Sequence, residues 1–71
     1  MKITVRAFWD EEAQVWAAQA DNKFGLFTEA ETVEELAKKL PIIARDLLGD
    51  EFHGELDIEL VTTSRQVIAA A

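Results

Sequence analysis

The chain has 71 residues, enough for one domain with a thin core, since a chain of this size buries only about 60% of the surface that it exposes when unfolded. Hydrophobic residues make up 49% and charged residues 30% of the sequence, a globular balance that argues against a disordered or low-complexity chain. The absence of cysteine excludes a disulfide framework and a thiolate metal site.

The charge balance and the N-terminal residues limit the partners and the compartment. Fourteen acidic residues against seven basic ones give a net charge of −7, which repels phosphate backbones, so we expect no direct nucleic-acid binding. The sequence leaves open whether this charge serves solubility or matches a basic protein partner. No segment approaches the ~18 consecutive apolar residues of a membrane span. Residues 1–6 also lack the apolar run of a signal peptide, so we expect a cytoplasmic protein without a membrane partner.

Residues 2–9 alternate polar and apolar side chains and predict a first strand, with one face formed by Ile3, Val5, Ala7 and Trp9. A four-residue turn over residues 10–13 would set Trp9 opposite Gln14 and start a second strand. The other face is too polar for a core, yet it brings Phe8 against Val15 near the hairpin tip. We therefore expect an apolar contact patch there.

A turn over residues 21–25 and a short third strand over residues 26–30 precede a helix. Thr32 and Glu35 have the spacing of a reciprocal capping box, which would start the helix at Val33. Apolar residues then recur at intervals of three and four, which predicts one buried stripe of Leu36, Ala37, Leu40, Ile43, Ala44 and Leu47. The stripe keeps its phase across Pro41, so we expect one kinked helix, which Gly49 would end.

Residues 55–60 alternate acidic and aliphatic side chains, which predicts a fourth strand with Leu56, Ile58 and Leu60 toward the core. A strand reached through a helical crossover is usually parallel to its neighbour. The sequence therefore predicts an α+β domain over residues 1–63, with the order β-β-β-α-β, a sheet order of 3-2-1-4 and one helix on one face. Residues 64–71 would form a C-terminal tail.

The strand order, the hairpin closed by acidic residues, Trp16, Gly25 and the segment Thr32-Val33-Glu34-Glu35-Leu36 together resemble the HicB-like antitoxin domain. The segments Arg6-Ala7-Phe8-Trp9-Asp10 and Leu40-Pro41 resemble a short branch of that family. The resemblance covers residues 2 to 63. It implies a partial RNase H-like fold that binds and neutralises a small basic mRNA-cleaving toxin of the HicA type. Members usually add a C-terminal DNA-binding module, but too few residues follow the last strand here, so DNA binding is not implied.

Several residues are candidates for a partner or oligomer interface: Phe8, Trp9, Val15, Trp16, Glu55, Asp57 and Glu59. The tryptophans are frequent interface anchors, although at least one of them is expected in the core. The thin core also predicts at least a homodimer. We expect no catalytic, cofactor or metal residues, since the lone His53 has no companion ligands in the sequence pattern.

An alternative function is a metal-dependent nuclease remnant built on Asp10, Asp57 and Glu59, because RNase H-like enzymes gather carboxylates around metal ions. Alternating acids on a strand more often form a solvated face that protects a sheet edge. A stand-alone oligomeric domain with a changed partner is a further alternative. A neighbouring reading frame encoding a small basic RNA-binding-like protein would favour the antitoxin.

Overall fold

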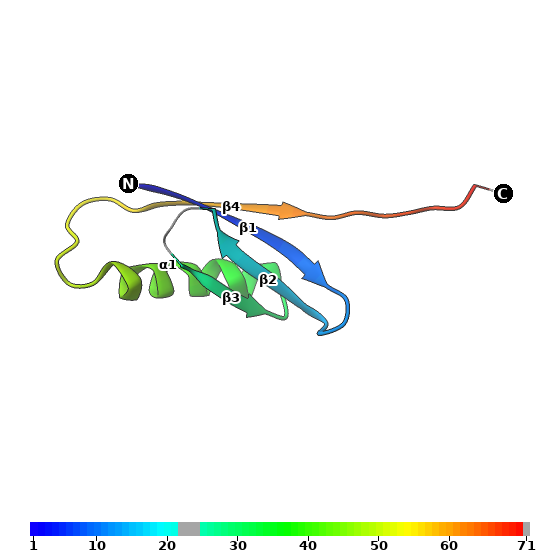
Figure 1. Ribbon diagram of the computed structural model, residues 1–71, viewed down its shortest axis with the longest axis horizontal. Coiled ribbons are helices and arrows are strands. Elements are labelled where there is room, and N and C mark those ends of the chain that lie inside the picture. The colour runs from blue at the N-terminus through cyan, green and yellow to red at the C-terminus, as the bar shows by residue number, and fades with distance from the viewer. Residues whose placement is uncertain (22–24, 71) are drawn as a thin grey trace.

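The fold is a four-stranded mixed sheet with one helix. The computed structural model describes residues 1–21 and 25–70, so most of the predicted turn over residues 21–25 lies outside the described residues. The elements follow in the order β1 (Lys2–Asp10), β2 (Val15–Ala20), β3 (Phe27–Ala30), α1 (Val33–Leu48) and β4 (Asp57–Thr63) (Figure 1). The sheet order is β3-β2-β1-β4, with β4 parallel to β1 and the other pairs antiparallel. The predicted α+β class, element order and sheet order are confirmed.

The register of the β1–β2 hairpin differs from the predicted one by two residues. Trp9 pairs with Trp16 rather than Gln14, and Phe8 pairs with Ala17 rather than Val15. Asp10 stays in β1, and its carboxylate Oδ1 accepts hydrogen bonds from the backbone N–H groups of Glu12 at 3.1 Å and Ala13 at 3.2 Å. The turn is thereby moved one residue along the chain. A shift of two residues leaves each side chain on its predicted face, since side chains alternate with a period of two.

Helix α1 begins and ends where the sequence predicts. The Glu35 N–H donates to the Thr32 Oγ1 at 3.1 Å, although the reciprocal bond of the capping box is absent between these two residues. The helix continues through Pro41, as predicted. At its end the Gly49 N–H donates to the Arg45 carbonyl oxygen at 3.1 Å.

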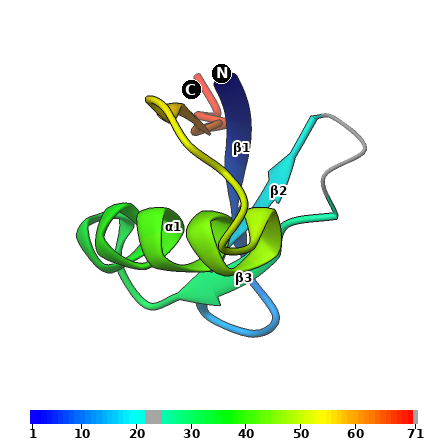
Figure 2. The same ribbon diagram turned by 90° about the vertical axis from the view of Figure 1, so that its left-hand side faces the viewer.

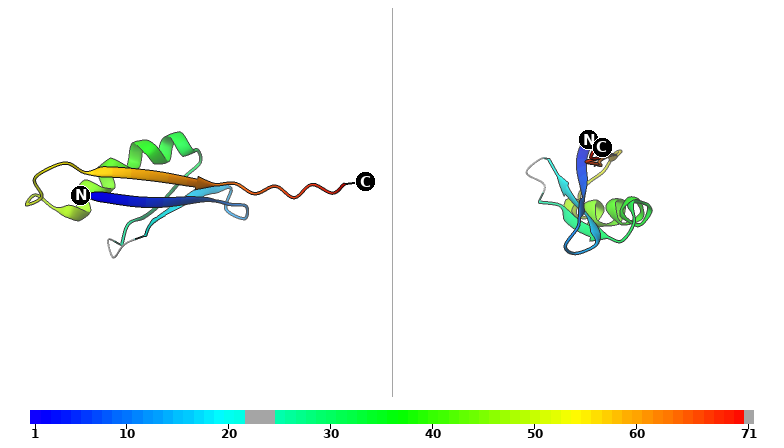
Figure 3. Two further views of the ribbon diagram at one scale, coloured as in Figure 1. Left: turned by 90° about the horizontal axis from the view of Figure 1, so that it is seen from above. Right: turned by 90° about the vertical axis from the view of Figure 1, so that its right-hand side faces the viewer.

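The buried stripe of α1 is narrower and shorter than predicted, since only Leu36, Leu40 and Ala44 are buried. Ala37 is exposed because it lies at the side of the stripe. Leu47 lies on the correct side of the helix but is 50% exposed. The last turn of α1 runs beyond the ends of β2 and β3, so these two strands do not cover it (Figures 1 and 3).

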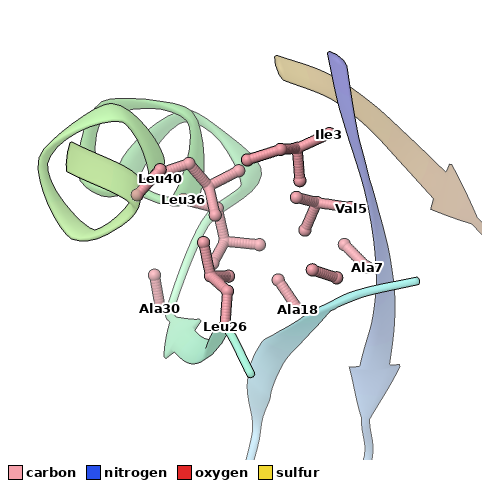
Figure 4. Close-up of a cluster of buried hydrophobic side chains, with 10 residues drawn as sticks. Ile3, Val5, Ala7, Ala18, Leu26, Ala30, Leu36 and Leu40 are labelled. Atoms are coloured by element: carbon pink, nitrogen blue, oxygen red, sulfur yellow. The ribbon is translucent and has the colours of Figure 1, made fainter. Parts of the chain in front are cut away.

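The core lies between α1 and one face of the sheet. Leu36 and Leu40 point from the helix toward Ile3 and Val5 of β1 (Figure 4). Leu26 is buried in the same cluster, although β3 begins one residue later than predicted. Strand β4 begins at Asp57 rather than Glu55, because Asp57 is the residue that pairs with Lys2 at the start of β1.

Residues 64–70 continue the direction of β4 as an extended segment, here called the C-terminal arm. The arm projects past the end of β1 and away from the rest of the molecule (Figures 1 and 3). It accounts for the elongated shape, with extents of 58 × 20 × 20 Å. All of its side chains are exposed.

Candidate interaction surface

One face of the sheet carries no helix, and it holds most of the predicted interface residues. Figure 2 shows α1 on one side of the sheet. Strand alternation places the side chains of Ile3, Val5 and Ala7 under the helix, whereas those of Thr4, Arg6 and Phe8 face away from it. We call this second side the open face.

An apolar cluster runs from the hairpin end of the open face to its middle, and we call Phe8, Val15, Ala17 and Phe27 the aromatic patch. Phe27 lies level with the middle of β1, since it pairs with Gln19, which pairs with Arg6. Phe8 is 47% exposed and Phe27 is 58% exposed. Ala17 lies directly opposite Phe8 in β1 and diagonal to Phe27 in β3, and it is only 3% exposed on a face that no helix covers. Glu29 of β3 pairs with Ala17 on its other side, so the two exposed rings and one carboxylate surround a small, covered residue.

The predicted acidic residues lie at the other end of the open face. Asp57 pairs with Lys2 and Glu59 with Thr4, whereas Phe8 pairs with Thr63. Four residues thus separate Glu59 from Thr63 along β4, a distance of about 13 Å. Glu59 Oε2 lies 3.5 Å from Lys2 Nζ in an exposed ion pair, which adds at most about 1 kcal/mol to stability. Glu55 precedes the strand, and its carbonyl oxygen accepts a hydrogen bond from the Met1 amino group at 3.1 Å.

Between these two ends the face contains a charged pair and a shallow hollow. Arg6 Nε donates to Asp21 Oδ2 at 2.7 Å. The hollow has a volume of about 400 Å³, and Arg6, Phe8, Gln19 and Asp21 contribute to its lining. Along β1 and β4 the open face thus presents apolar, paired-charge and acidic regions in sequence.

The two tryptophans form a cross-strand pair on the helix side of the hairpin end. Their ring centroids are 5.7 Å apart and the planes meet at 64°, an edge-to-face arrangement that stabilises aromatic pairs. Trp16 packs against the core, whereas Trp9 is exposed and donates its indole N–H to Glu11 Oε2 at 2.7 Å. The structure therefore divides the two predicted roles, with Trp16 partly in the core and Trp9 at the surface.

The three carboxylates of the nuclease alternative are not brought together. Asp10 ends β1, whereas Asp57 and Glu59 lie beside the first residues of that strand. Along β1, Asp10 lies eight residues from the partner of Asp57 and six from the partner of Glu59, which correspond to about 26 and about 20 Å. The Asp10 carboxylate also accepts backbone N–H bonds within the turn. Within residues 1–21 and 25–70, no three His, Asp or Glu side chains are arranged to hold a metal ion.

Two open-face residues were not among the sequence candidates. Phe27 follows the buried Leu26, and Val61 follows the half-buried Leu60. Phe27 lies inside the predicted third strand, so the same two-residue alternation that identified Phe8 already places it outward. Val61 would have followed from the same alternation if the predicted fourth strand had been extended by one residue. Val61 pairs with Arg6 and continues the apolar surface toward β4.

No helix in the described part of the chain is long and apolar enough to cross a membrane.

Comparison with known proteins identifies the family. A family model described as "Domain of unknown function (DUF1902)" matches residues 2–70. The chain belongs to the DUF1902 family. The crystal structure of hypothetical protein TTHA1013 from the extremely thermophilic bacterium Thermus thermophilus resembles this DUF1902 domain with a TM-score of 0.77 and 38% sequence identity, over 96% of this chain and 100% of that chain. No curated protein matches the chain with comparable significance.

Proposed function

We propose that this DUF1902 domain is a non-catalytic protein-interaction module of the HicB antitoxin type, which binds and neutralises a small basic mRNA-cleaving toxin. The observation that carries the proposal is the aromatic patch, where Phe8 and Phe27 stand exposed on a sheet face without a helix. Exposed aromatic rings around a packed centre are typical of binding surfaces.

The charge of the chain supports a basic partner. Acidic residues outnumber basic ones by fourteen to seven, and Asp57 and Glu59 lie on the same face as the aromatic patch. Such charges speed encounter with a basic protein, while buried aromatic anchors slow its release. The β-β-β-α-β order and the sheet order support the resemblance to a partial RNase H-like HicB domain.

The first experiment is to test whether the product of the adjacent gene co-purifies with the tagged domain. Phe8→Ala should then raise the dissociation rate about 5- to 30-fold, since a hot-spot truncation of 1 to 2 kcal/mol corresponds to that factor. Reversal of both charges in Glu55→Lys/Glu59→Lys should instead lower the association rate and its dependence on salt. Surface plasmon resonance measures both rates.

Two control variants make the same kinds of substitution at sites away from the open face. Ile42 is also an exposed apolar residue but lies on α1, so Ile42→Ala should leave both rates unchanged. Asp50→Lys/Glu51→Lys, which reverses two exposed charges in the loop before β4, is the control for the double charge reversal. Failure of the adjacent product to bind would refute the antitoxin role. Equal effects of Phe8→Ala and Ile42→Ala, with circular dichroism unchanged, would refute the open face as the binding surface.

A further inference from the structure

The outer part of the C-terminal arm carries apolar side chains that are almost fully exposed. Val67 is 82% exposed and Ile68 is 83% exposed, and Ala69 and Ala70 follow them. Residues 64–70 contain Arg65 and no acidic residue, in an otherwise acidic protein. An extended apolar segment of this kind is suited to strand addition at a free sheet edge.

The outer edge of β4 is such an edge. Among the described residues β4 pairs only with β1. The Asp57 N–H donates to the Met1 carbonyl oxygen at 2.8 Å, toward β1. Because backbone groups alternate in direction along a strand, those of Ile58, Leu60 and Thr62 point to the outer edge. Ile58 and Leu60 are also only half-buried, although they pack against the core.

A groove lies on the helix side of this edge. It has a volume of about 330 Å³, and its apolar lining comes from the second half of α1, the following loop and the start of β4, namely Pro41, Leu48, Phe52, Leu56 and Ile58. The groove lies at the start of β4, whereas the arm of the same molecule extends from the end of β4 and leads away from the groove (Figure 3). An arm that ran antiparallel to β4 would reach it, and a second copy of this chain supplies such an arm.

We propose that two copies of this chain exchange their C-terminal arms, each arm pairing antiparallel with the outer edge of β4 in the other copy. The dimer then has a two-fold axis at Ser64, and the two sheets become one sheet of eight strands. Strand β4 has seven residues and the described arm, residues 64–70, has the same number, so the arm covers the edge along its length. This assembly leaves the open face free and does not depend on the function proposed above.

The side chains select the register. With Ser64 opposite Ser64 of the other copy, Ile68 falls opposite Leu60, Ala70 opposite Ile58 and Val67 opposite Val61. Apolar residues then meet on both faces of the sheet, and Ala70 arrives at the groove beside Ile58. Centring the pair on Thr63 instead would set Val67 opposite Glu59 and Gln66 opposite Leu60. None of the side chains of residues 64–70 is acidic, so none of them repels Asp57 or Glu59 at this edge.

The first test is the molar mass in solution at micromolar concentration, measured by sedimentation equilibrium. The full chain should give twice its 8.0 kDa. Ile68→Asp should give the monomer mass, because it sets a carboxylate against Leu60. Ile42→Asp places the same charge on an exposed apolar site of α1 and should remain dimeric. A monomeric full chain would overturn the proposal, as would a dimeric Ile68→Asp variant.

Disulfide trapping tests the register. Because the chain has no cysteine of its own, each variant carries a single cysteine and only the intended disulfide can form. Ser64→Cys should form a disulfide-linked dimer under mild oxidation, because directly opposed hydrogen-bonded residues have Cα atoms about 5.5 Å apart, within the range of a disulfide. In the Thr62→Cys dimer each cysteine lies opposite Gln66 of the other copy, so the two cysteines are about 13 Å apart along the strands. They should form the disulfide at least tenfold more slowly than those of Ser64→Cys. Equal linking of both variants would overturn the antiparallel arm exchange.

Discussion

Replacement of Leu36 by alanine should destabilise the domain far more than the same replacement at Leu47. Both residues lie on the same side of α1, but Leu36 is 0% exposed and Leu47 is 50% exposed. Truncation to alanine removes three carbon groups, worth about 2.4 kcal/mol when fully buried, and the cavity that remains raises the cost to about 3 to 4 kcal/mol. At Leu47 the expected cost is about 1 kcal/mol, since half of the side chain is already in water.

The measurement is urea unfolding followed by the fluorescence of Trp9 and Trp16, which lie in the β1–β2 hairpin. A domain of 71 residues has a total stability of about 4 to 10 kcal/mol, so loss of 3 to 4 kcal/mol produces a large fall in the midpoint. All variants are compared at one protein concentration, because self-association would add to the apparent stability. Equal losses at the two positions would refute the conclusion that the last turn of α1 lies beyond the cover of β2 and β3.

Two further substitutions test the ends of the same helix. Thr32→Ala should cost about 1 kcal/mol by removing the acceptor of the Glu35 N–H, and Thr32→Ser should restore most of it; unfolding curves that do not separate the two variants would exclude the capping role. Gly49→Ala should cost about 1 to 3 kcal/mol, because its backbone has φ 81° and ψ 177°, a region nearly confined to glycine. The cost would come from the backbone alone, since a Cβ at this position would meet no atom within 4 Å. An unchanged unfolding midpoint would show that the backbone adapts without strain.

The two proposed interactions use different parts of the sheet. The toxin-binding proposal uses the open face, centred on the aromatic patch. The arm exchange uses the outer edge of β4 and the groove on the helix side. A dimer formed by arm exchange would therefore present two open faces on one continuous sheet, and loss of dimerisation in Ile68→Asp would not by itself remove the partner surface.

For the candidate interface, the sequence predicted correctly which side chains face outward, because this depends on strand alternation. The predicted pairing of β1 with β2 was wrong, because it depends on the turn between them. Phe8 faces away from the core because polar and apolar residues alternate in β1, and this pattern is local. Its partner is Ala17 rather than Val15, because the Asp10 carboxylate binds the backbone of the turn and keeps Asp10 within the strand. The type of turn decides such a register, and four acidic and small residues in a row do not specify it.

By itself the sequence determined the order of the elements, the helix ends and the face of the sheet on which each side chain lies. These features depend on interactions between near neighbours: the Thr32 cap, the positive φ of Gly49 and the period of two in each strand. Only the tertiary structure decided which apolar residues are covered. Leu47 has the right phase but lies in the last turn of α1, past the ends of β2 and β3. Phe27 and Phe8 meet no second layer, and the arm continues past the end of β1. Coverage depends on where separate elements end relative to one another, and no local pattern carries that information.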